Sequence, residues 1–92
     1  MGLTEVQIAK ATRIALRAVN GGEKKVCAYW SISPKQMLFL ISAKKHSYHY
    51  IMVEVTEHEH SEWQASILFD RERTLSDPVR EDPNMIFKDF GG

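Results

Sequence analysis

The stretch Ser47–Asp70, with the sequence SYHYIMVEVTEHEHSEWQASILFD, decides the fold of this chain. It contains two runs, Tyr48–Thr56 and Trp63–Asp70, that are dense in aromatic and β-branched residues, as β-strands are. The short polar segment Glu57–Glu62 between them predicts an antiparallel pair. Both faces of this pair carry apolar side chains, whereas an antiparallel sheet with one face in water is polar on that face.

Two more strands are predicted ahead of this pair, over Lys25–Ser33 and Gln36–Ala43. Short turns at 33–35 and 44–47 join them to each other and to the strand that follows. Connections of this length link antiparallel neighbours, so the four strands are expected to form a meander.

A helix is predicted over Thr4–Asn20, before the first strand. Thr4 and Gln7 have the spacing of a capping box, and Asn20-Gly21-Gly22 ends the periodic pattern. One helix face carries an apolar stripe that suits packing on a sheet, and this stripe consists of Ile8, Ala11, Ala15 and Val19.

These elements predict an α+β fold, in which one N-terminal helix packs on a four-stranded antiparallel meander sheet. Residues 1–70 are expected to form the single domain, and residues 71–92 an irregular linker with an apolar C-terminal arm. The arm is expected to dock on the domain or on a partner.

The composition is that of an ordinary globular domain, with 43% hydrophobic and 26% charged residues among 92. The single cysteine, Cys27, cannot form an internal disulfide, and no apolar run is long enough to cross a membrane. We therefore expect a cytoplasmic protein that needs no cofactor.

Strand alternation divides the sheet side chains into two sets. The set expected to face the helix consists of Val26, Ala28, Trp30, Ile32, Met37, Phe39, Ile41, Ile51, Val53, Val55, Trp63, Ala65, Ile67 and Phe69. The opposite, outer face is also largely apolar, and one helix cannot cover both faces. The arm, a second subunit or a binding partner is expected to cover the outer face, unless a register slip of one residue exchanges the two sets.

The main functional hypothesis is therefore a small non-catalytic interaction domain with a regulatory, inhibitory or accessory role. It would bind a protein partner, or itself as a homodimer, through the outer face and the arm. Tyr and Met are enriched in interface cores. The predicted contact residues are Tyr29, Leu38, Leu40, Tyr48, Tyr50, Met52, Leu68, Met85, Ile86, Phe87 and Phe90.

The alternative is nucleic-acid binding, because the charge is split along the chain. Residues 1–50 carry eight Lys/Arg and two acidic residues, whereas residues 51–92 carry four and ten. A basic helix ridge with Lys-rich turns has the footprint that phosphates require. The residues that would carry this function are Lys10, Arg13, Arg17, Lys24, Lys25, Lys44 and Lys45.

Catalysis and metal binding have little support in the sequence. His58 and His60 are only weak metal candidates, because a stable zinc site needs three or four ligands. No serine or cysteine has the surroundings of a nucleophile, so an enzyme is not expected. A third possibility is a small-molecule pocket between helix and sheet, which predicts a cavity beside His49.

Overall fold

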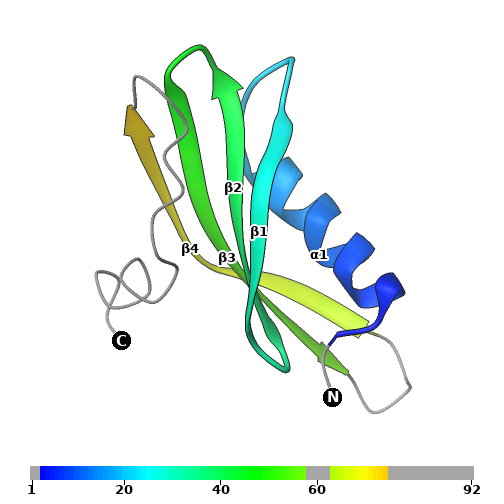
Figure 1. Cartoon of the computed structure of the whole chain (residues 1–92). Coiled ribbons are helices and arrows are strands. Elements are labelled where there is room, and N and C mark those ends of the chain that lie inside the picture. The colour runs from blue at the N-terminus through cyan, green and yellow to red at the C-terminus, as the bar shows by residue number, and fades with distance from the viewer. Residues whose placement is uncertain (1–2, 58–62, 75–92) are drawn as a thin grey trace.

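The computed structural model of this protein describes residues 3–57 and 63–74. In this part the chain forms α1 (Glu5–Ala18), β1 (Lys25–Ser33), β2 (Gln36–Lys44), β3 (Ser47–Glu57) and β4 (Trp63–Thr74). The strands make one antiparallel sheet in the order β1-β2-β3-β4, and α1 lies along one of its faces (Figure 1). The predicted α+β fold is confirmed.

The start of α1 follows the predicted capping box. The Gln7 N–H donates to Thr4 Oγ1 at 3.2 Å, and the Thr4 N–H donates to Gln7 Oε1 at 2.9 Å. The helix ends at Ala18 rather than at Asn20, because Val19 takes extended backbone angles with φ −94° and ψ 123°. In this conformation Val19 is 1% exposed and belongs to the core.

The helix-facing core lies between α1 and the sheet. Ala11 and Ala15 are fully buried there, and their small side chains allow the helix axis to lie close to the strands. The helix packs over β2, β3 and β4, while its contact with β1 is slight at most. The buried residues of this core are Ala11, Ala15, Val19, Met37, Phe39, Ile41, Ala43, Ile51, Val53 and Val55.

A bulge in β1 changes which of its side chains face the helix. The register of β1 against β2 shifts between Val26 and Ala28, which makes Cys27 an extra residue in β1. An extra residue reverses the alternation of the strand beyond it. Tyr29 therefore lies on the helix side, opposite Phe39, with 6.3 Å between the two ring centroids.

Several predicted placements in the sheet are wrong because of bulges. Tyr29 was expected on the outer face but lies on the helix side. The register of β4 against β3 also shifts, at Leu68, so that Phe69 lies opposite Met52. The residues predicted to face the helix that instead pack with the outer cluster are Ala28, Trp30, Ile32 and Phe69.

The outer face carries a second hydrophobic cluster. Leu38, Leu40, Tyr50 and Met52 form its centre, and each of these side chains is at most 1% exposed. Side chains from β1, β3 and β4 that are only partly buried pack around this centre. The sheet therefore has buried apolar side chains on both faces.

The last strand is longer than its apolar pattern indicates. β4 continues to Thr74, past the predicted end of the domain at Asp70. Its second half pairs with the start of β3, where Arg73 lies opposite Tyr48 and Arg71 lies opposite Tyr50. Backbone pairing with β3 extends the strand through a polar segment, so the expected linker at 71–74 is part of the sheet.

Candidate interaction surface

The predicted outer-face contact residues differ widely in exposure. The four central ones are buried, as described above, so a partner would reach them only after the chain rearranges. Tyr48 is half-buried, whereas Leu68 is 47% exposed. A contact through the outer face stays a prediction. The arm residues Met85, Ile86, Phe87 and Phe90 lie outside the described residues.

An open apolar region among the described residues lies at the side of the molecule formed by β1. This strand is the first of the sheet order, so among the described strands it pairs only with β2. Alternate N–H and C=O groups along its other edge are therefore free of strand partners in the described part of the chain. An added strand can pair with such an edge.

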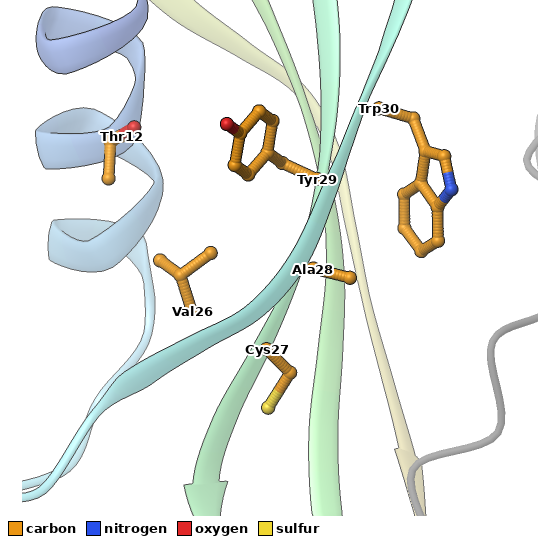
Figure 2. A pocket seen from close by; sticks show the side chains of 6 residues that line it. All are labelled: Thr12, Val26, Cys27, Ala28, Tyr29 and Trp30. Carbon is orange, nitrogen blue, oxygen red and sulfur yellow. The ribbon is translucent and has the colours of Figure 1, made fainter.

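A groove of about 480 Å³ runs along this edge (Figure 2). Thr12 of α1 and Tyr29 of β1 face each other across it, with Val26 on the same side. Trp30 points to the other side of β1. Side chains of an added strand would thus meet apolar surface on both sides of β1.

Tyr29 is the exposed aromatic residue of this groove. Its side chain is 58% exposed, although its ring lies beside the ring of the buried Phe39, with 6.3 Å between the two centroids. The reason lies in the placement of α1, which covers β2, β3 and β4 and leaves the β1 side of Phe39 without helix cover. A solvent-exposed tyrosine whose ring lies beside a buried aromatic residue has the properties of an interface anchor.

The predicted basic residues do not form one surface. Lys10, Arg13 and Arg17 surround a shallow depression of about 150 Å³ on α1. They lie on the side of the helix opposite Ala11 and Ala15, and hence away from the sheet.

The other predicted basic residues have different positions. Lys24 donates from Nζ to the Leu16 carbonyl oxygen at 2.6 Å, so it stabilises the end of α1. Lys25 begins β1, while Lys44 and Lys45 lie at the turn between β2 and β3. The ridge of Lys10, Arg13 and Arg17 is therefore the candidate phosphate-binding surface.

A polar cleft of about 230 Å³ lies beside His49, at the end of α1. His49 Nδ1 is 3.0 Å from Asp70 Oδ1, and the Ser47 hydroxyl donates to Glu72. The cavity required by the small-molecule hypothesis is thus present. The polar groups named here are paired with one another, which suits a structural role for His49.

Metal binding finds no support in the described residues. His58 and His60 lie outside them, and residues 3–57 and 63–74 contain no group of three His, Cys, Asp or Glu side chains placed to hold a metal ion. In the same part of the chain, no helix has the length and apolar character needed to cross a membrane.

Sequence reasoning missed the groove residues Thr12, Val26 and Trp30 as a functional set. The first strand of an open meander sheet lies at an edge, so the predicted meander was a signal for a free edge at Lys25–Ser33. The side of the strand on which Tyr29 lies depends on the bulge at Cys27, and no pattern of residues in the sequence predicts that bulge. No protein-family model, curated protein or solved structure matches this chain.

Proposed function

We propose that this chain is a small non-catalytic protein-interaction domain that binds a protein partner, or a second copy of itself, along β1. The observation that carries the proposal is the open edge of β1 beside a groove that contains the 58% exposed Tyr29. Main-chain pairing along such an edge supplies affinity, and pockets for alternate side chains supply selectivity. A regulatory or accessory role in the cytoplasm fits this function.

The contact is placed at β1 rather than at the centre of the outer face because of exposure. Side chains at most 1% exposed already have their apolar surface removed from water, so they have little to gain from a partner. The groove offers exposed aromatic surface together with free backbone groups. Trp30 and the rim of the outer cluster would lie at the border of this contact.

A capture experiment with the full chain tests the proposal. The tagged protein is immobilised and exposed to an extract of its native host, and captured proteins, including untagged copies of the same chain, are identified by mass spectrometry. Tyr29→Glu is expected to abolish specific capture, because it puts a charge in the centre of the contact. Leu68→Glu introduces the same charge on β4, at a residue 47% exposed, and is expected to retain capture.

Far-UV circular dichroism of both variants establishes that they are folded. Retention of every captured protein by Tyr29→Glu would contradict the placement of the contact at β1. Loss with Leu68→Glu alone would favour the outer face instead.

The second candidate function is nucleic-acid binding through Lys10, Arg13 and Arg17. The supporting observation is that these three cations share one side of α1 around a shallow depression. Like charges at this spacing repel one another and destabilise a helix slightly, and bound phosphates would relieve that repulsion.

Titration of the chain with duplex DNA at increasing salt tests this candidate. Three phosphate contacts predict that affinity falls about 40-fold between about 50 and 200 mM salt. Arg13→Glu with Arg17→Glu is expected to remove the binding. Lys44→Glu with Lys45→Glu makes the same change in net charge at the turn between β2 and β3. Equal losses in the two double variants would exclude a specific role for the ridge.

A further inference from the structure

The centre of the outer cluster is buried more completely than the face of a single sheet layer allows. Its four central side chains are at most 1% exposed, although α1 packs on the other face of the sheet (Figure 1). These four are Leu38, Leu40, Tyr50 and Met52. Side chains stand roughly perpendicular to a sheet, so neighbours on the same face shield their flanks rather than their tips. Burial of the tips requires a further layer over the outer face.

The described residues provide no such layer. Residues 3–57 and 63–74 form one helix and one sheet, and the helix belongs to the other face. The side chains packed against the four central ones come from β1, β3 and β4, and they are themselves only partly buried. The exposures are those of a single chain, which favours a cover from the chain itself over a second molecule.

One stretch outside the described residues has the apolar character that such a cover needs. The segments 1–2 and 58–62 are short, and the second of them is polar. Residues 85–90, with the sequence MIFKDF, contain four large apolar side chains among six residues. Side chains of this kind gain free energy when they are buried against an apolar face. The four are Met85, Ile86, Phe87 and Phe90.

The strand β4 ends close enough to the outer cluster for the same chain to reach it. Thr74, the last residue of β4, lies opposite Ser47 at the start of β3. Tyr50 and Met52 follow Ser47 by three and five residues, which is about 10–17 Å along the strand. Residues 75–84 are a connection of ten residues. A flexible connection of that length has a typical end-to-end distance of about 16–19 Å, so it spans the gap without being stretched.

The charge of the outer face favours the same segment. Arg71 lies opposite Tyr50, so it is on the outer side of β4, and Arg73 is on that side by alternation. The acidic residues that alternate with them line the polar cleft at the end of α1, on the helix side. Residues 75–92 carry four acidic and two basic residues, a net charge of −2. This negative charge complements the two arginines.

We propose that residues 75–92 of the same chain cover the outer cluster, with the apolar run 85–90 packed over its four buried side chains. The arm then forms a third layer that keeps this face from water, separate from the contact proposed at β1. A flexible tether of this length gives an effective concentration of about millimolar, which favours the arm over a second molecule. An external apolar segment would reach the outer face only by displacing the arm.

Paramagnetic relaxation, measured by NMR on the full chain, tests where the arm lies. The spin label is attached at Ser66→Cys in a chain that also carries Cys27→Ala. Ser66 is exposed, and it lies opposite Glu54, which alternation places on the outer side two residues after Met52. The label is expected to broaden the amide signals of residues 85–90.

The same label at Ala9→Cys is the control, because Ala9 is exposed on α1, and it is expected to leave these signals sharp. In a second sample, the isotope label and the spin label are placed on different chains. Absence of broadening from Ser66→Cys would overturn the inference. Broadening only between different chains would also overturn it, and would identify a second copy as the cover.

Binding of the apolar dye ANS gives an independent readout. Phe87→Asp with Phe90→Asp puts two charges in the apolar run, and it is expected to raise ANS fluorescence several-fold because the cluster loses its cover. Lys88→Asp makes the same change in net charge in the same segment, and it is expected to leave the fluorescence at the wild-type level. Circular dichroism establishes that both variants are folded. Equal fluorescence of the double variant and the wild-type chain would contradict the proposed cover.

Discussion

Tyr50→Ala is expected to lower the free energy of unfolding by about 3–5 kcal/mol, the range for loss of a large buried aromatic side chain. Tyr50 is 1% exposed and lies in the outer cluster with Leu40 and Met52. Its replacement removes apolar contacts and leaves a cavity that the packed neighbours cannot fill completely. Urea denaturation of the chain at low micromolar concentration measures the change.

The same measurement decides whether the outer face is a second core or an open contact surface. Leu68→Ala is the control, since Leu68 is 47% exposed, and its effect is expected to stay within about 0.5 kcal/mol. If Tyr50→Ala were equally mild, Tyr50 would not be buried in the isolated chain. The outer face would then regain its place as the primary candidate for partner binding.

Ala15→Glu is expected to destabilise the chain by about 3–5 kcal/mol or to prevent folding, because it buries a charge without a partner. Ala15 is 0% exposed at the centre of the contact between α1 and the sheet. The larger side chain would also force the helix away from β3 and β4. Thermal and urea unfolding, followed by circular dichroism, measure the loss.

Ala9→Glu is the matched control on the same helix. Ala9 is exposed, and a glutamate there lies one helical turn before Arg13, where opposite charges attract. Its unfolding free energy is expected to stay within about 0.5 kcal/mol of wild type. Equal destabilisation by both variants would contradict the orientation of α1 on the sheet.

Local pattern was sufficient to predict the elements of this fold. The capping box at Thr4 and the alanine-rich stripe describe contacts within one helix, and both are present in the structure. The strands β1, β2 and β3 begin and end within a residue of their predicted bounds. Such features depend on residues close together in the chain, so the sequence displays them directly.

The candidate contact was harder to predict, because its residues depend on strand register. Tyr29 was among the predicted contact residues, but the bulge at Cys27 moves it to the side of the helix. A bulge forms where the best packing of two neighbouring strands requires an extra residue, and this balance involves both strands. The alternation of residues along one strand therefore does not predict where a bulge forms.

Sequence by itself determined that this chain forms a helix followed by a four-stranded meander, and that the sheet has apolar side chains on both faces. Only the tertiary structure decided which side chains fill the two cores and which lie open at the edge. The physical reason is that the apolar pattern shows which side chains gain free energy from burial. Strand register and the position of the helix determine which of these side chains are in fact buried. Sequence pattern and tertiary structure differ most, for the proposed function, at Tyr29. Its place in the pattern is apolar, but it is 58% exposed beside β1, which the helix does not cover.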